Sequence, residues 1–173
     1  MPIRATAFFV WAYASTAVAQ FTGPTPIGAG VYQGTTSLGD LDGDGDLDLF
    51  VTGHDGTVYR SDVYLNNGSG FAGSISVGPG LNASSVSLGD LDRDGDLDYV
   101  ATGWDGGTRV FFRNMNNGGG TFAGPIPFGA GGVNNSSTSL GDIDGDGAMD
   151  LIVTGIDIGS VSHLDMYTNN GAG

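Results

Sequence analysis

The chain of 173 residues has a formal net charge of −14, from 19 acidic residues that are all Asp against five Arg. Nucleic-acid binding needs a basic surface, so this charge argues against a nucleic-acid partner. The absence of Cys excludes disulfides and thiolate metal sites. Gly accounts for 33 residues and neither Glu nor Lys occurs, so helix is disfavoured and we expect an all-β fold.

Residues 1–19 have the layout of a secretory signal peptide. Arg4 gives a positive start, residues 5–13 form a largely apolar core, and Ala17-Val18-Ala19 matches the small-residue cleavage pattern before Gln20. The segment is short for a membrane span. We therefore expect a secreted or cell-surface protein with no membrane span in this chain. The alternative is an apolar strand that belongs to a preceding repeat.

After the signal peptide the chain divides into three similar units, residues 20–70, 71–121 and 122–173. Each unit has a Phe near its start, then Ser-Leu-Gly-Asp, an acidic loop, an apolar segment and finally Asn-Asn-Gly, which is a strong hairpin-turn signal. We expect four short strands per unit. A period near 50 residues with four strands is typical of a β-propeller blade.

The apolar segment after each acidic loop has apolar residues at consecutive positions, which predicts a strand that is covered on both faces. Propellers close with about four to eight blades. Three units cannot close a ring, so we expect these blades of four antiparallel strands to be part of a longer propeller of the seven-bladed type. The alternative is self-association of two copies that completes a six-bladed ring.

The three acidic loops are DLDGDGDLD at 40–48, DLDRDGDLD at 90–98 and DIDGDGAMD at 142–150. Carboxylates recur at loop positions 1, 3, 5 and 9, and Gly occupies position 6, where a tight reversal needs a positive φ. Oxygen ligands at this spacing around one loop indicate a hard cation, with Ca²⁺ favoured over Mg²⁺. An EF-hand is excluded because position 12 is never Glu.

Loop position 7 is Asp, Asp and Ala in the three units, and because Ala148 has no side-chain oxygen we expect this position to offer its backbone carbonyl. Position 4 is Gly43, Arg93 and Gly145, and we expect its side chain to point to solvent. The predicted Ca²⁺ ligands, about one ion per unit, are Asp40, Asp42, Asp44, Asp46, Asp48, Asp90, Asp92, Asp94, Asp96, Asp98, Asp142, Asp144, Asp146, Ala148 and Asp150.

The alternative to a metal site is a solvated acidic turn. Like charges a few ångströms apart repel by about 1–4 kcal/mol per pair at a surface-like dielectric, so a loop of four carboxylates without a cation would be destabilised. Three Ca²⁺ ions would change the formal charge from −14 to −8. We expect the ions to stabilise a chain that has no disulfides.

The acidic loop within a unit of about 50 residues, followed by Asn-Asn-Gly and Phe, resembles the FG-GAP/VCBS repeat family over essentially all of residues 21–173. The resemblance implies propeller blades like those of integrin α-subunits, with Asp40, Asp42, Asp44, Asp48 and their counterparts as calcium ligands. The motif pairs that name the family occur here only as Phe-x-Gly and as Gly-Ala-Gly or Gly-Pro-Gly. That departure favours the VCBS-type variant of secreted bacterial proteins.

The sequence suggests two functions and disfavours a third. The first is a non-enzymatic, calcium-binding adhesion or interaction module whose partner is a protein or carbohydrate at the cell surface or in the extracellular matrix. The second is a carbohydrate-binding or scaffold region of a larger secreted hydrolase or lyase. An intrinsic enzyme is disfavoured because His54 and His163 do not occupy equivalent repeat positions and no catalytic spacing appears. Asp55, Asp105 and Asp157 recur in every unit and are expected to be turn or inter-blade hydrogen-bonding residues.

Overall fold

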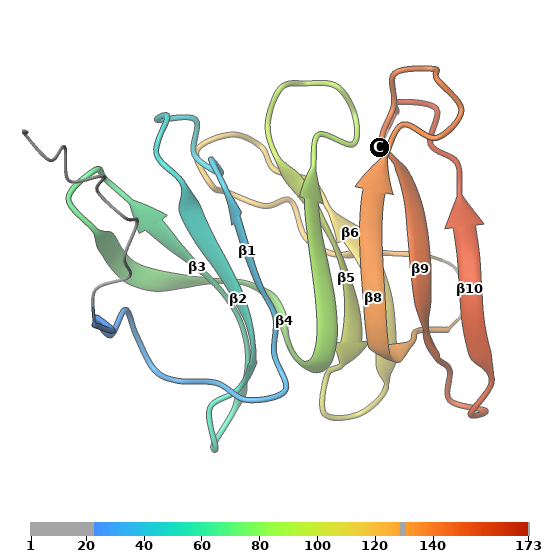
Figure 1. Cartoon of the computed structure of the whole chain (residues 1–173), viewed down its shortest axis with the longest axis horizontal. Coiled ribbons are helices and arrows are strands. Elements are labelled where there is room, and N and C mark those ends of the chain that lie inside the picture. The colour runs from blue at the N-terminus through green and yellow to red at the C-terminus, as the bar shows by residue number, and fades with distance from the viewer. Residues whose placement is uncertain (1–22, 129–130, 173) are drawn as a thin grey trace, which may run out of the picture.

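The computed structural model describes residues 23–128 and 131–172, so the predicted signal peptide lies outside the described residues. Every element in the described part is a β-strand (Figure 1). The strands are β1 Thr36–Gly39, β2 Asp48–His54, β3 Tyr59–Asn66, β4 Phe71–Gly89, β5 Asp98–Trp104, β6 Arg109–Asn114, β7 Ile126–Pro127, β8 Asn134–Gly141, β9 Asp150–Ile156 and β10 Ser162–Tyr167.

All neighbouring strands pair antiparallel, in the orders β1-β2-β3-β4-β5-β6-β7 and β10-β9-β8. The 19-residue strand β4 belongs to two blades. Its residues 71–81 pair with β3, whereas residues 82–89 pair with β5, with a register shift on each side of the junction. Blade 1 therefore comprises β1, β2, β3 and 71–81; blade 2 comprises 82–89, β5, β6 and β7; and blade 3 comprises β8, β9 and β10.

These blades confirm the predicted fold class of antiparallel propeller blades. The topology adds that the strand after the Phe of a unit is the outer strand of the preceding blade. Ile75 lies opposite Val63, and Ile126 lies opposite Arg113. The sequence period and the structural blade are therefore offset by one strand.

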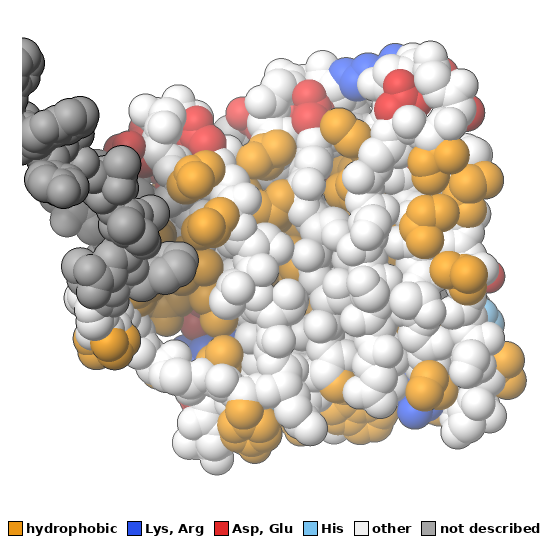
Figure 2. Space-filling view, viewed as in Figure 1, with side chains coloured by type: hydrophobic (Ala, Val, Ile, Leu, Met, Phe, Trp, Pro, Cys, Tyr) orange, Lys and Arg blue, Asp and Glu red, His pale blue; other side chains and the backbone are white. Residues whose placement is uncertain are grey.

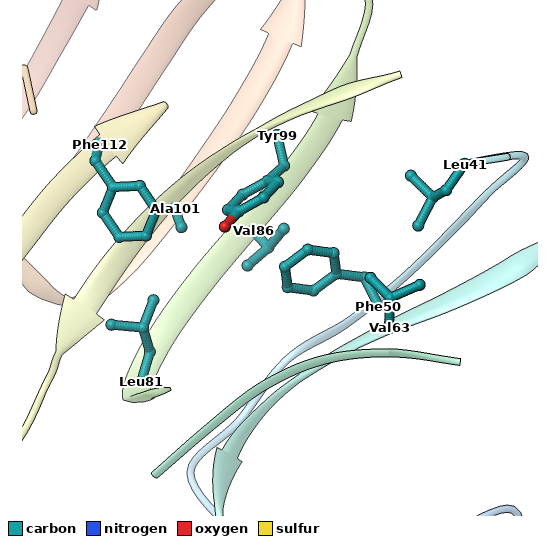
Figure 3. Packing of buried hydrophobic residues seen from close by; sticks show 8 residues of the cluster. All are labelled: Leu41, Phe50, Val63, Leu81, Val86, Tyr99, Ala101 and Phe112. Carbon is teal, nitrogen blue, oxygen red and sulfur yellow. The ribbon is translucent and has the colours of Figure 1, made fainter. Parts of the chain in front are cut away.

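The hydrophobic core lies between the blades. One cluster joins Phe50 and Val63 of blade 1 to Tyr99 and Phe112 of blade 2 (Figure 3). A second cluster, which includes Val100, joins blade 2 to blade 3. Successive residues of β5 thus enter different clusters, and all of the strand except its last residue is buried. This confirms the prediction of cover on both faces for the segment after the second acidic loop. In β2 and β9, the first and last of the three segments, alternate residues are only half-buried or exposed, so the prediction is not met in full there.

Short polar contacts also cross the blade interfaces. The hydroxyls of Thr52 and Ser84 lie 2.7 Å apart between blades 1 and 2, and those of Thr102 and Ser136 lie 2.6 Å apart between blades 2 and 3. Equivalent residues therefore make equivalent contacts one blade further along. The repeat in the sequence produces a repeat in the interface.

We expect Phe50→Ala to destabilise the protein by about 3–5 kcal/mol, because a large buried aromatic is replaced by a cavity. The Phe50 ring is fully buried and its centroid lies 4.7 Å from that of Tyr99. Chemical denaturation monitored by fluorescence and circular dichroism measures the loss. Ile158→Ala is the control, since this side chain is exposed in the turn between β9 and β10 and its truncation should change the free energy of unfolding little. Equal losses for the two variants would contradict the placement of the core.

Candidate metal centre

The three acidic loops connect equivalent strands on one rim of the molecule. They join β1 to β2, β4 to β5, and β8 to β9. Their Asp side chains gather along the upper edge in the view of Figure 2. The repeat therefore places three acidic sites side by side rather than on separate faces.

In each loop the Asp residues at positions 1 and 3 are brought together with one further Asp. The clusters are Asp40, Asp42 and Asp48 in the first loop; Asp90, Asp92 and Asp94 in the second; and Asp142, Asp144 and Asp146 in the third. Within a cluster, one carboxylate oxygen from each residue lies within 4.8 Å of the others. Oxygens bound to a common Ca²⁺ at about 2.3–2.6 Å are separated by at most about 5.2 Å, so the donor sets fit one Ca²⁺ per loop.

The first Asp of each loop organises the backbone around its own carboxylate. Asp40 accepts hydrogen bonds from the N–H groups of Gly43 at 2.8 Å and Gly45 at 3.0 Å. Asp142 repeats this arrangement with Gly145 and Gly147. The Gly at position 6 has φ of +93° in the first loop, +99° in the second and +87° in the third, a conformation that side-chain-bearing residues rarely adopt.

The Asp at position 9 of each loop is fully buried and links the loop to the Asn turn. One oxygen of Asp98 accepts the N–H of Leu91 at 2.8 Å and the other accepts the N–H of Asn116 at 2.8 Å. Asp48 and Asp150 make the equivalent pairs of bonds. The sequence predicted the Asp at position 9 only as a ligand and did not predict this structural role.

The surroundings shift the pKa of three loop carboxyls. Partial burial, together with the charges of neighbouring Asp residues, raises the pKa of Asp42. Burial likewise raises the pKa of Asp98. By contrast, the N–H groups of Asn169 and Ile143 lower the pKa of Asp150. A cation would favour the charged form of all three groups.

Position 7 lies outside the three clusters. The N–H groups of Asp46, Asp96 and Ala148 each donate to the carboxylate of the preceding position-5 Asp, at 2.9, 2.9 and 2.7 Å. The Ala148 side chain is buried. The backbone-carbonyl role at this position stays a prediction, as does the full ligand set given above.

Arg93, at position 4 of the second loop, is exposed to solvent as expected, but its guanidinium also reaches the third loop. Its Nη2 donates to the carbonyl of Asp146 at 3.0 Å and lies 3.3 Å from the Asp146 carboxylate. Because sequence spacing says nothing about the neighbouring loop, the two loops could not be paired from the sequence.

The first Asn of the second and of the third Asn-Asn-Gly makes an inter-blade contact that hairpin reasoning missed. Asn116 Nδ2 donates to the carbonyl of Leu41 in the preceding blade at 2.8 Å, and Asn169 Nδ2 donates to that of Leu91 at 2.7 Å. Leu41 and Leu91 occupy position 2 of their loops. Each Asn thus connects the acidic loop of its own blade to the loop of the blade before it. The recurrence of Asn at this place in every unit is the sequence signal that could have indicated a structural role beyond the turn.

The recurrent Asp after β2, β5 and β9 holds a turn, as predicted. Asp55 Oδ1 accepts the N–H groups of Thr57 and Val58, both at 2.8 Å, and Asp105 repeats this with Gly107 and Thr108. In unit 3, Asp157 accepts the N–H of Val161. The pKa of Asp55 is lowered to about 2 by these N–H groups and by Arg60.

The two His residues lie in different surroundings. The ring of His54 packs between those of Tyr32 and Tyr59, with centroids 5.3 and 4.7 Å away. His163 Nε2 lies 3.0 Å from a carboxylate oxygen of Asp157, and its Nδ1 lies 3.1 Å from one of Asp165.

We expect Asn116→Ala to lower the free energy of unfolding by about 1–3 kcal/mol, because the Leu41 carbonyl loses a buried donor. Thermal and urea denaturation would measure the loss. Asn117→Ala is the matched control, since the neighbouring Asn117 is exposed. A loss no larger than that of the control would show that the inter-blade amide contributes nothing.

We expect the pKa of His163 to lie above 6.5, because the hydrogen bond to Asp157, and then that to Asp165, favour the protonated ring. The ion pairs then stabilise the fold fully below the unfolded pKa, and this contribution is lost as pH rises through the raised folded pKa. Titration of the imidazole by NMR should show the shift, and Asp157→Asn should reduce it. Asp105→Asn, at the equivalent turn of unit 2, should leave it unchanged; a His163 pKa insensitive to Asp157→Asn would contradict the pairing.

Comparison with known proteins agrees with this geometry. The model of the FG-GAP-like repeat matches the chain twice, over residues 40–101 and 90–153. Each match begins at the first Asp of one acidic loop and extends past the next loop in the chain. No curated protein and no solved structure matches the chain. No helix in the described part of the chain is long and apolar enough to cross a membrane. Because the two matches span more than half of the sequence, the chain belongs to the FG-GAP-like repeat family.

Proposed function

We propose that the chain is a calcium-binding, non-enzymatic interaction module of an exported protein, in which Ca²⁺ staples the strand-connecting loops of propeller blades. The observation that carries the proposal is the recurrence of one Asp cluster at the same place in three adjacent blades. Asp provides the hard oxygen donors that Ca²⁺ prefers. Calcium is plentiful outside the cell, which agrees with the predicted signal peptide.

The ion would act on stability through the residues that already shape each loop. The clustered carboxylates repel one another, and the raised pKa of Asp42 reflects that repulsion in part. A bound divalent cation removes the repulsion and closes the loop over its own backbone N–H groups. The Asp at position 9 also holds the Asn turn. A loop ordered by Ca²⁺ in one blade therefore fixes the hydrogen bond to the preceding blade.

An interaction role is supported by how the remaining polar groups are used. The carboxylates of Asp55 and Asp105 accept turn N–H groups, and His54 is packed between tyrosines. These three side chains are therefore engaged in turns and ring packing. The partner that we propose is a protein or carbohydrate at the cell surface or in the matrix.

Calorimetric titration of the purified chain with Ca²⁺ should detect about three sites. Thermal denaturation should show a higher melting temperature with Ca²⁺ than without it. Binding at 100 times the dissociation constant adds about 2.7 kcal/mol per site to the free energy of unfolding. Asp92→Asn should remove one site and part of the thermal shift. Asp105→Asn makes the same change in charge outside the loops and should keep all three sites. A melting temperature that does not respond to Ca²⁺ would overturn the proposed stabilising role of the ion. A larger response to Mg²⁺ would overturn the choice of Ca²⁺.

A further inference from the structure

The strand β10 is an edge of its sheet in the described structure, whereas β3 and β6 are not. Blade 1 receives its outer strand from residues 71–76, and blade 2 receives its outer strand from β7. In both cases the donor is the segment that follows the Phe of the next sequence unit. Blade 3 has the order β10-β9-β8 and leaves the outer side of β10 unpaired.

A segment of the same kind lies unused at the other end of the described chain. Residues 23–27, Gly-Pro-Thr-Pro-Ile, occupy the place in unit 1 that Gly-Pro-Ile-Pro-Phe at 124–128 occupies in unit 3. Residues 23–27 are exposed and belong to none of the described strands. Thr25 corresponds in position to Ile75 and Ile126, which pair with Val63 and Arg113. The equivalent residue of β10 is Met166, so the repeat also defines a register.

The face of blade 3 that a following blade would cover is built like the covered faces of blades 1 and 2. Position 2 of the acidic loop is 1% exposed at Leu41 and 4% at Leu91, but 52% exposed at Ile143. On β6 of blade 2 and the equivalent β10 of blade 3, the buried Phe111 corresponds to Leu164, which is 76% exposed. Hydrophobic side chains gather on the flank of the molecule where β10 lies (Figures 1 and 2).

The face of blade 1 that no other described blade covers carries residues of the kind that cover blades 1 and 2. Leu88 and Leu97 of blade 2 close over Gly39, and Leu140 and Met149 of blade 3 close over Gly89. Gly141 of blade 3, in contrast, has open space above its Cα. The residues equivalent to the covering pair are Leu38 and Leu47 of blade 1, and both are exposed.

A polar contact has matching halves on the two faces as well. Asn116 and Asn169 each donate to the position-2 carbonyl of the preceding loop. Asn66 Nδ2 donates to Leu47 of its own loop at 3.2 Å, and no described side chain donates to the carbonyl of Ile143. A blade 1 placed after a blade 3 would bring Asn66 to that carbonyl.

We propose that the chain associates head-to-tail with a second copy of itself, with residues 23–27 of one copy forming the outer strand on β10 of the other. Addition of a strand to an exposed edge is an established mode of recognition. Each copy both donates and accepts, and two copies bring six blades together, within the range in which propellers close. Both copies carry a charge of −14, so association is favoured by salt and by Ca²⁺ in the loops.

Sedimentation and light scattering of the purified chain in calcium and physiological salt should give twice the mass of one chain. Leu164→Arg should convert the dimer to a monomer whose circular dichroism is unchanged, since this side chain is exposed. Ile158→Arg is the matched control, because Ile158 is 74% exposed but lies in the turn between β9 and β10. A monomeric wild-type chain overturns the proposal and assigns both faces to other blades or partners. A dimer that persists in Leu164→Arg also overturns it.

Cross-linking tests the strand register directly, because the chain has no Cys of its own. Directly opposed residues in an antiparallel pair have Cα atoms about 4.5–5.5 Å apart, which suits a disulfide. The double variant Thr25→Cys with Met166→Cys should therefore form an intermolecular disulfide under mild oxidation. Thr25→Cys with Leu164→Cys is displaced by two residues and should cross-link poorly. Equal cross-linking of the two pairs, or none in the first, would contradict the proposed register.

Discussion

The structure depends most on one buried carboxylate per unit, that of the Asp at position 9 of each acidic loop. Asp98 shows the arrangement: one oxygen holds Leu91 near the start of the loop and the other holds Asn116 at the far end of the next hairpin. Burying a charge is costly unless hydrogen bonds or a cation compensate. Here two backbone N–H groups compensate in part, and the proposed Ca²⁺ would supply the rest. The same side chain thus fixes the loop, the hairpin and the contact with the preceding blade.

The blade interface follows from this constraint. With Asn116 held by Asp98, its amide is aimed at the Leu41 carbonyl in the preceding loop, and below it Phe50, Val63, Tyr99 and Phe112 form the core. In the described part of the chain, each core cluster takes residues from two blades, so no blade there buries a core within itself. Stability should therefore behave as a sum of neighbour terms, as in other repeat proteins. Loop chemistry and hydrophobic packing act across the same boundary.

Much of this arrangement could be predicted from the sequence, because it depends on local spacing repeated three times. The consecutive apolar residues of β5 indicated burial on both faces, and the Asp spacing indicated clustered oxygens at the first and third loop positions. Contacts between units could not be predicted. The reach of Arg93 to Asp146 depends on which loops are neighbours in space. Local spacing also predicts the outer strand within its own unit, whereas the chain passes from one blade to the next within β4 with no break in the strand.

That transfer of a strand between units has a consequence for how blades join. A blade whose outer strand comes from the following unit can only be completed by something after it, whether in the same chain or in another. Backbone pairing of the β10 edge, burial of Leu164 and covering of Gly141 would all be satisfied by one partner surface, and blade 1 presents that surface at the matching positions. The offset between sequence unit and blade therefore turns a stack of repeats into a unit with one accepting and one donating end. A partner surface that offers a donor strand, two leucine-like side chains and one amide would match all of these positions at once.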